Sequence, residues 1–276
     1  MKILITGGNG NIAKMIKRNL SSSYEITNLS RNDLNVLHLK EIEEYLNQHS
    51  YDILVHTAIL GGRRTKEENG DVTHNNLVML ENLLKFVDRF KMIINFDSAA
   101  IYDRSTDILN RKEENLFTIP TDFYGFSKYV IYQRSLQYSN MFNFRIFNIF
   151  HSQEEPDRFT KSCFLAKRKG TQVTIFEDKY FDFVYEDDFI KIIDYYFQNV
   201  DHPEKLEKTL NICYPEKYKL SEIAKMILEN REDQIQIIKE NSQNNYSGDG
   251  EKMKQMDIPM DGLRTSLTKY ESLFIQ

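Results

Sequence analysis

Short apolar runs alternate with amphipathic segments over about the first 150 residues of the chain. The run Ile3-Leu4-Ile5 leads into a glycine-rich turn, and apolar residues then recur at helical spacing up to Leu20. The same order repeats and predicts strands at 24–29, 53–55, 92–96 and 142–149 and helices at 39–48, 77–90 and 123–138. The strands are continuously apolar and do not alternate, which is typical of a parallel sheet covered by helices on both faces.

After Asn148 this rhythm weakens, and the chain is expected to leave the sheet. Short strand-like pieces follow at 173–176, 181–184 and 210–212, and helical patterns at 188–197 and 220–230. The stretch 240–251 is polar and rich in Asn, Ser and Gly, so we expect a loop there.

The composition is that of a soluble globular protein, with 276 residues, 41% apolar and 28% charged. The 36 basic and 41 acidic side chains are intermixed and give a net charge of −5, which argues against a nucleic-acid surface. The two cysteines and six histidines show no metal-ligand spacing, so no metal site is expected. With no signal-like or membrane-spanning run either, we expect a cytoplasmic protein whose partner is a small molecule.

The turn Gly7-Gly8-Asn9-Gly10-Asn11-Ile12-Ala13 lies between the first strand and the first helix. Glycine permits positive φ and close approach of a pyrophosphate, and the helix N-terminus supplies unsatisfied N–H donors. An ordinary strand-to-helix turn is the alternative. The position of the turn in a βαβ frame favours dinucleotide binding by Gly7, Gly10, Asn11 and Ile12.

The second strand ends at Ser30-Arg31-Asn32-Asp33. An acidic residue at the tip of this strand accepts the ribose 2′-hydroxyl of NAD, whereas an arginine pairs with the 2′-phosphate of NADP. Ser30 and Arg31 come before Asp33, so NADP(H) is favoured and NAD(H) is the alternative. Arg31 as an ordinary surface charge also fits the pattern.

Tyr124 and Lys128 are four residues apart and face the same side of a predicted helix. Ser98 follows the fourth strand, so all three side chains can meet at the carboxyl edge of the sheet. The ammonium of Lys128 would stabilise a tyrosinate, while Ser98 would hold a reacting oxygen by a hydrogen bond. This trio suits hydride transfer to or from a carbinol carbon.

The chain resembles the extended short-chain dehydrogenase/reductases, also called the NAD-dependent epimerase/dehydratase family of nucleotide-sugar enzymes. The resemblance covers nearly the whole chain and rests on the glycine turn, the trio and several further segments. These segments are His56-Thr57-Ala58, Asn76 with Asn82-Leu83-Leu84, Asp97-Ser98-Ala99-Ala100-Ile101-Tyr102, Tyr124-Gly125-Phe126-Ser127-Lys128, Arg145-Ile146-Phe147-Asn148 and Phe183-Val184-Tyr185-Glu186-Asp187-Asp188.

The resemblance implies that Tyr124 is the general acid/base and that Lys128 also binds the nicotinamide ribose. It implies that Ser98 orients the substrate oxygen and that Asn148 contacts the diphosphate of a nucleoside diphosphate sugar. Thr57 and Ala58 are implied to line the cofactor. A role in cell-surface polysaccharide synthesis follows from the same resemblance.

Departures from the family narrow the expected chemistry. The 4,6-dehydratases of the family carry an Asp-Glu pair where Ala99 and Ala100 stand, and fucose-synthase-like members carry a cysteine at Ala100. Redox chemistry at one carbon remains, and the segments 30–35 and 59–64 resemble keto-deoxysugar reductases more than epimerases. The expected function is NADPH-dependent reduction of a 4-keto (deoxy)sugar nucleotide. A 4-epimerase with retained NAD and a non-catalytic cofactor-binding relative are the alternatives. Arg63 lies in a loop that could reach the diphosphate of the substrate or be only a solvated basic loop.

The expected fold is α/β. Residues 1–150, with a returning segment near 173–200, form an NAD(P)-binding Rossmann domain with a doubly wound parallel sheet. Residues 151–276 form a smaller, mainly substrate-binding region. The resemblance also implies a homodimer that uses the helix bearing Tyr124. Four apolar or aromatic side chains of this helix suit either that interface or the core of the chain: Tyr129, Val130, Tyr132 and Leu136.

Overall fold

The computed structural model describes residues 1–62, 66–229 and 231–275, and the chain divides into two compact units. The first unit comprises 1–103, 116–145 and 192–210, and the second comprises 104–115, 146–191 and the chain from 211 onward. This division differs from the boundary at 150 expected from the sequence. The segment that returns to the first unit is 192–210 and not 173–200, and 104–115 belongs to the second unit.

A six-stranded sheet forms the centre of the first unit, with the strand order β10-β6-β4-β3-β1-β2. Its strands are β1 (Lys2–Thr6), β2 (Glu25–Leu29), β3 (Ile53–His56), β4 (Met92–Ser98), β6 (Met141–Ile146) and β10 (Thr209–Ile212). The pairs β1 with β2, β1 with β3 and β3 with β4 are parallel. The order reverses between β1 and β3, which places the glycine turn after β1 at the crevice where α/β sheets bind ligands.

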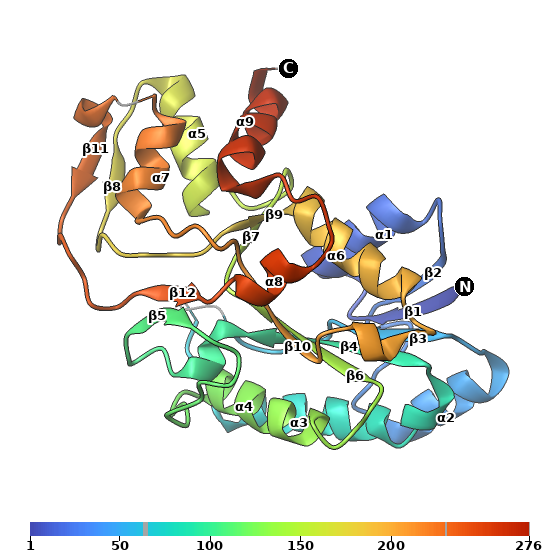
Figure 1. Cartoon of the computed structure of the whole chain (residues 1–276). Coiled ribbons are helices and arrows are strands. Elements are labelled where there is room, and N and C mark those ends of the chain that lie inside the picture. Colours follow the sequence, from blue (N-terminus) through green and yellow to red (C-terminus); the bar gives the residue numbers. More distant parts are fainter. Residues whose placement is uncertain (63–65, 230, 276) are drawn as a thin grey trace. The chain divides into compact units, whose positions relative to one another are not determined.

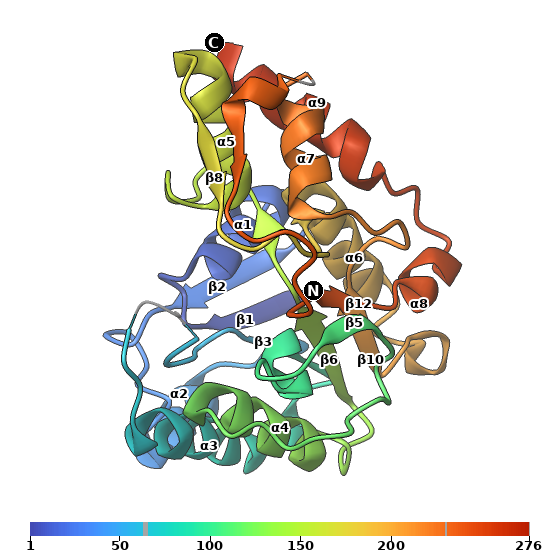
Figure 2. The ribbon, with the colours of Figure 1, turned by 90° about the vertical axis from the view of Figure 1, so that its left-hand side faces the viewer.

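Helices cover both faces of this sheet, as the apolar strands predicted. In both views α2 (Leu39–Gln48), α3 (Gly70–Leu84) and α4 (Phe123–Ser135) lie on one face, and α1 (Asn11–Leu20) lies on the other (Figures 1 and 2). The C-terminal half of α6 (Glu186–Gln198) packs on strand β6 through Tyr196, whose ring lies 4.5 Å from that of Phe144. The fold class is therefore the expected doubly wound α/β sheet.

Helix α3 differs from the helix expected at 77–90. It begins at Gly70, where the side chain of Asn69 accepts a hydrogen bond from the Asp71 amide at 3.0 Å, and it ends at Leu84. Residues Val87–Arg89 form a separate 3-10 turn. The first turns of α3 are polar and partly exposed, so apolar periodicity did not predict them. The N-cap residue Asn69 was the sequence signal available for this helix start.

In the part of the chain that the structure describes, the second unit consists of paired short strands and several helices. The strands pair as β5 with β12, β7 with β9 and β8 with β11. They are β5 (Ile108–Arg111), β7 (Ile149–Phe150), β8 (Val173–Ile175), β9 (Val184–Tyr185), β11 (Ile235–Ile237) and β12 (Tyr246–Gly248). The helices are α5 (Phe159–Lys169), α7 (Leu220–Ile227), α8 (Glu251–Gln255) and α9 (Gly262–Ile275). Glu232–Gln234 forms a 3-10 turn in this unit, whereas the 3-10 turns Ala99–Tyr102 and Pro203–Lys205 belong to the first unit.

The loop expected at 240–251 contains strand β12, which pairs with β5. Neither strand has an apolar run long enough to predict it. Asn110 donates its backbone N–H to the hydroxyl of Ser247 at 2.9 Å, and Asn245 donates its backbone N–H to Asp107 at 2.9 Å. These polar contacts, formed between residues far apart in the sequence, place the segment from 104 to 115 in the second unit.

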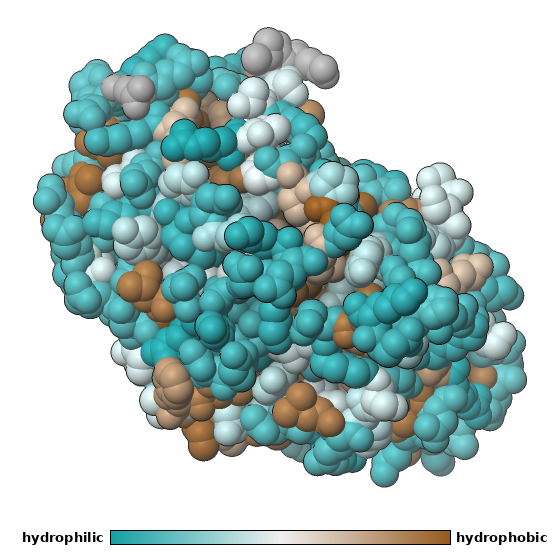
Figure 3. Space-filling view, viewed as in Figure 1, coloured by the Kyte–Doolittle hydropathy of each residue, from teal (hydrophilic) through white to brown (hydrophobic). Residues whose placement is uncertain are grey.

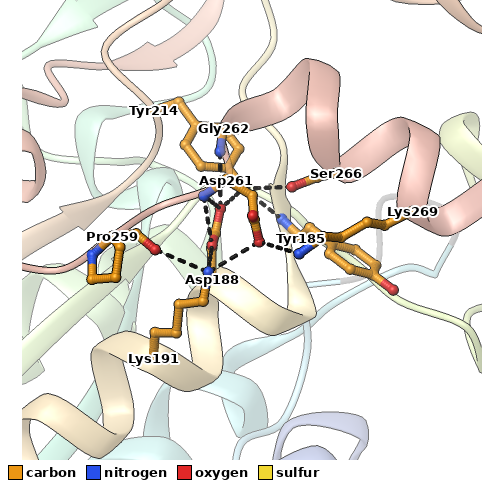
Figure 4. Close-up of polar contacts among 9 residues, drawn as sticks. All are labelled: Tyr185, Asp188, Lys191, Tyr214, Pro259, Asp261, Gly262, Ser266 and Lys269. Carbon is orange, nitrogen blue, oxygen red and sulfur yellow. Dashed lines mark hydrogen bonds and ion pairs between the residues drawn. The ribbon is translucent and has the colours of Figure 1, made fainter.

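A buried carboxylate, that of Asp188 at the start of α6, fixes helix α9 (Figure 4). It accepts hydrogen bonds from the Tyr214 hydroxyl at 2.7 Å and from the backbone amides of Asp261 and Gly262 at 3.0 and 3.1 Å. The ammonium of Lys191 also donates to the Asp188 carboxylate, at 2.8 Å. The first N–H groups of α9 are thus satisfied by a carboxylate from another helix.

Within residues 1–62, 66–229 and 231–275, every helix is too short or too polar to span a membrane.

We predict that Asp188→Ala lowers the free energy of unfolding by about 2–4 kcal/mol, because it leaves a buried hydroxyl and several amides without their acceptor. Asp187→Ala is the matched control at the neighbouring, exposed carboxylate, and it should change stability by less than about 0.5 kcal/mol. Urea unfolding followed by circular dichroism measures both values. Equal losses in the two variants would contradict the role of Asp188.

Candidate functional site

The glycine turn is held between the ends of β2 and β3. Gly7 has φ +74°, and a Cβ at this position would lie 2.6 Å from the amide nitrogen of Ala58. Gly8 donates its backbone N–H to the carbonyl of Leu29 at 2.8 Å. Only glycine combines the positive φ with this close backbone approach, so the sequence dictates the shape of the turn.

Gly10 is the N-cap of α1 and has no side chain to cap the helix. The amides that follow, including those of Asn11 and Ile12, therefore present donors at the positive end of a ten-residue helix. A pyrophosphate fits this cradle, because its oxygens accept N–H bonds and its charge suits the helix dipole. The residues present thus fit the dinucleotide that the sequence predicted.

A pocket of about 400 Å³ adjoins the glycine turn, formed by the turn, α1 and the end of β2. Its charged lining residues are Lys14, Lys17, Arg18 and Asp33. The carboxylate of Asp33 accepts hydrogen bonds from the backbone N–H and the hydroxyl of Ser30, which hold its pKa below the usual range. The three cations outnumber the single carboxylate, so the pocket favours an anionic group.

Two residues expected to bind the cofactor at this strand end differ in placement. Ser30 lines the pocket, whereas Arg31 is exposed and is not among the lining residues. Sequence reasoning missed the three cations on α1. Their spacing at i, i+3 and i+4 was the available signal, because it places them on one face of the helix.

The loop after β3 leads from the glycine turn to Tyr124. Thr57 donates its hydroxyl to the carbonyl of Thr6 at 2.7 Å, and a Cβ at Gly62 would lie 2.9 Å from the ring carbon Cζ of Tyr124. The Gly62 amide donates to Glu68 at 2.6 Å. Arg63, expected to contact the substrate, lies outside the described residues.

Asn76 on α3 ties this loop to helix α4. Its side-chain oxygen accepts from the Leu60 amide at 2.8 Å, and its side-chain nitrogen donates to the Leu60 carbonyl at 3.0 Å and to the Ser127 hydroxyl at 3.1 Å. Asn76 is 1% exposed. It thereby sets the distance between the loop that packs on Tyr124 and the helix that carries Tyr124.

Lys128 lies near Tyr124 and at the carboxyl end of β4, the strand that ends at Ser98. Lys128 donates its ammonium to the Phe96 carbonyl, two residues before Ser98, and its Nζ lies 5.8 Å from the centre of the Tyr124 ring. The Ser98 hydroxyl accepts from the Ala100 amide at 3.2 Å, which leaves its hydrogen able to donate to a substrate oxygen. The Asp122 side chain caps α4 through the Gly125 amide at 2.8 Å.

Burial dominates the electrostatics of Lys128. The side chain is 4% exposed, and burial lowers its pKa to about 8 although the charge of Asp97 opposes the shift. Burial, together with the charge of Lys128, lowers the pKa of His56 to about 3, so His56 is neutral at physiological pH. Lys128 is therefore a buried cation close to the Tyr124 ring.

The alanines after Ser98 are fully enclosed, with Ala99 0% and Ala100 1% exposed. Asn148 belongs to the second unit, where its carbonyl accepts from the Val184 amide at 2.9 Å. Tyr132 is 8% exposed and packs in the core of the first unit, whereas Leu136 is exposed. Within the described ranges, no three His, Cys, Asp or Glu side chains gather as metal ligands do.

Comparison with known proteins finds a family model that matches most of this chain. The model of the NAD dependent epimerase/dehydratase family matches residues 3–213. A curated relative, GDP-L-colitose synthase of Yersinia pseudotuberculosis, is 30% identical over 112 residues. That match covers 39% of this chain and 36% of the relative, so it spans about a third of the length of that protein.

Solved structures share the fold at low sequence identity. A GDP-mannoheptose C4 reductase from Campylobacter jejuni with NADP bound has a TM-score of 0.80 and 18% identity, covering 100% of this chain and 98% of that one. A UDP-N-acetylglucosamine 4-epimerase from Bacillus cereus has a TM-score of 0.78 and 21% identity, covering 100% of both chains. Reductases and epimerases thus share this backbone.

Proposed function

The chain belongs to the NAD dependent epimerase/dehydratase family, and from this premise we propose that it is an NADPH-dependent reductase of a 4-keto sugar carried by a nucleoside diphosphate. One observation carries the proposal. Lys128 and Tyr124 meet at the end of β4 beside Ser98, while two buried alanines follow Ser98.

The proposed reaction reduces a carbonyl group to an alcohol. The nicotinamide, when bound, supplies the hydride to the carbonyl carbon. Tyr124 transfers its hydroxyl proton to the carbonyl oxygen, and the ammonium of Lys128 stabilises the tyrosinate that remains. Ser98 donates a hydrogen bond to the same oxygen and so fixes the carbonyl toward the hydride donor. We propose Asn148 as a contact of the substrate diphosphate.

Ala99 and Ala100 argue for plain reduction. Dehydration needs an acid and a base beside the hydroxyl residue, and epimerisation next to a ketone needs a base to remove a carbon-bound proton. An alanine methyl group can do neither, and both methyl groups are buried. Chemistry at one carbon remains, either as reduction by an exchangeable cofactor or as 4-epimerisation with a retained one.

The charge of the pocket beside the glycine turn supports NADPH as the cofactor. A 2′-phosphate carries up to two negative charges, whereas NADH presents a neutral hydroxyl at this position. We propose that Lys14, Lys17 and Arg18 bind the phosphate, since they line the pocket that the turn adjoins. Arg31, exposed shortly after β2, is a second candidate for this contact.

We predict that Tyr124→Phe lowers turnover by at least about a hundredfold, the scale of lost general acid catalysis, without weakening cofactor binding. Turnover is the loss of NADPH absorbance with 4-keto sugar nucleotides on GDP, UDP and dTDP. Tyr129→Phe, on the same helix, is the control and should keep wild-type turnover. Retained turnover in Tyr124→Phe would overturn the assignment, and sugar interconversion without net NADPH loss would favour the epimerase.

We predict that Lys14→Gln weakens NADPH binding by about tenfold, equivalent to about 1.4 kcal/mol, and leaves NADH binding nearly unchanged. Fluorescence titration of the purified protein after removal of any bound dinucleotide measures both dissociation constants. Arg31→Gln is measured as well, to compare the two residues that could bind the 2′-phosphate. Lys40→Gln on α2 is the control. Tighter binding of NADH than of NADPH by the wild type would refute NADP(H) preference.

We also propose that the protein is a homodimer joined through helix α4. Phe123, Phe126 and Leu136 are exposed on or next to α4, and apolar side chains are exposed over the α3 and α4 region of the surface (Figure 3). Tyr132 belongs to the core of the chain and takes no part in this surface. Exposed apolar groups that gather on one helix favour a contact with another chain.

Light scattering coupled to gel filtration should give the mass of two chains for the wild type and 32.7 kDa for Phe126→Asp, which places a charge in the interface. Phe176→Asp, at an exposed phenylalanine of the second unit, should leave the dimer intact. A monomeric wild type would exclude the dimer.

A further inference from the structure

Two charged side chains outside the Ser98, Tyr124 and Lys128 trio are buried at the end of β4. Asp97 is 3% and Arg145 0% exposed, and the Nε of Arg145 donates to Oδ2 of Asp97 at 2.8 Å. Removing two charges from water costs several kcal/mol per ion, and an apolar pair of similar volume is often as stable. A gain in stability is therefore a poor reason for this buried ion pair, and its contacts indicate another role.

Arg145, on β6, connects three elements around the site. Its Nη1 donates to the Tyr102 hydroxyl at 2.6 Å, at the end of the 3-10 turn that Ser98 begins. Its guanidinium lies 4.7 Å from the ring centre of Tyr102 and 4.9 Å from that of Tyr132 on α4. Strand β6, the turn after Ser98 and the helix that carries Tyr124 and Lys128 thus converge on one guanidinium.

Asp97 links this anchor directly to Ser98. Its Oδ1 accepts from the Ser98 amide at 2.8 Å, while its Oδ2 is held by Arg145. The Ser98 hydroxyl in turn accepts from the Ala100 amide. The Asp97 carboxylate therefore orients the backbone of Ser98, and the Ala100 amide orients its hydroxyl.

Asp97 also acts on Lys128. Among the residues that the structure describes, the charged or titratable groups around the Lys128 ammonium are His56 on β3, Asp97 on β4 and Tyr124 on α4. Arg145 on β6 pairs with Asp97. His56 is neutral, since burial lowers its pKa to about 3. Asp97 supplies the negative charge in this set, and it opposes the loss of the Lys128 proton that burial favours.

We propose that Asp97 and Arg145 are positioning residues for the reaction: Arg145 holds the Asp97 carboxylate where it fixes Ser98 and keeps the Lys128 ammonium protonated beside Tyr124. This inference rests on the proposed function, since it assigns the pair to the chemistry of the trio. Lys128 must be charged when Tyr124 gives up its proton, and its ammonium is nearly excluded from solvent. A fixed negative charge sustains that state.

The first test measures the Lys128 proton without any substrate. Protein labelled with ¹³C at the lysine Cε is titrated by NMR, and the Lys128 signal is identified by its absence in Lys128→Arg. Asp97→Asn keeps an acceptor for the Ser98 amide but removes the charge, so the Lys128 midpoint should fall by about 1 pH unit from the wild-type value, the scale of a nearby-charge effect.

Asp201→Asn is the matched control, because it removes a carboxylate of the first unit that pairs with Lys91 at the surface at 2.9 Å. Its Lys128 midpoint should equal that of the wild type. An unchanged midpoint in Asp97→Asn would overturn the electrostatic part of the proposal.

Asp97→Asn leaves the Arg145 charge buried without its carboxylate, which endangers folding. The double variant Asp97→Asn/Arg145→Met removes both charges and is the fallback. The charge of Asp97 raises the pKa of Lys128 against the effect of burial, so the midpoint in the double variant should still be lower than in the wild type.

The second test concerns the geometry of Ser98. Arg145→Lys keeps the charge but loses the planar group that joins Asp97 to Tyr102. Single-turnover reduction should slow by about tenfold to a hundredfold, with little change in KM and with the Lys128 midpoint near the wild-type value. In Asp97→Asn the basic limb of the kcat profile should move to lower pH. Wild-type rates in Arg145→Lys would overturn the positioning role.

The two tests separate this inference from the proposed function. If the wild type reduces no 4-keto sugar nucleotide, the proposed function fails, while the NMR titration still decides whether Asp97 sustains the Lys128 charge. If the wild type reduces the substrate and the midpoint does not move, the inference fails alone.

Discussion

The burial of the Lys128 ammonium is the constraint around which the candidate site in the first unit is arranged. A charge that is 4% exposed loses most of its hydration, and burial lowers its pKa to about 8. The Phe96 carbonyl accepts from it and Asp97 balances it, while His56 is kept neutral. These contacts come from the ends of adjacent parallel strands, so the sheet must be in register before the site exists.

The cofactor cradle depends on a different constraint, the close approach of backbones. At Gly7 the turn after β1 lies against the backbone of Ala58, and at Gly62 the loop after β3 lies against the ring of Tyr124. Asn76 and Glu68 hold that loop by hydrogen bonds to Leu60 and Gly62. A single connected loop thus joins the proposed dinucleotide site to the proposed acid.

A large part of the fold was evident in the sequence. Continuous apolar strands separated by amphipathic helices predicted the doubly wound sheet, because buried parallel strands need apolar residues on both faces. Ser98, Tyr124 and Lys128 are predicted to meet because each follows or faces the carboxyl end of a strand. The structure places the Lys128 ammonium near the Tyr124 ring and at the Phe96 carbonyl, two residues before Ser98. Strands β5 and β12 could not be predicted, since their pairing depends on polar contacts between distant segments.

The sequence by itself determined the glycine turn and the alternation of strands and helices in the first unit, because each follows from local spacing or from the conformational freedom of glycine. Tertiary structure alone decided which charges come together. Asp97 and Arg145 are 48 residues apart, and Lys14, Lys17 and Arg18 form part of a pocket only where α1 adjoins the end of β2. Electrostatic interactions depend on the distance between charges and on their burial, and neither follows from the order of residues along the chain.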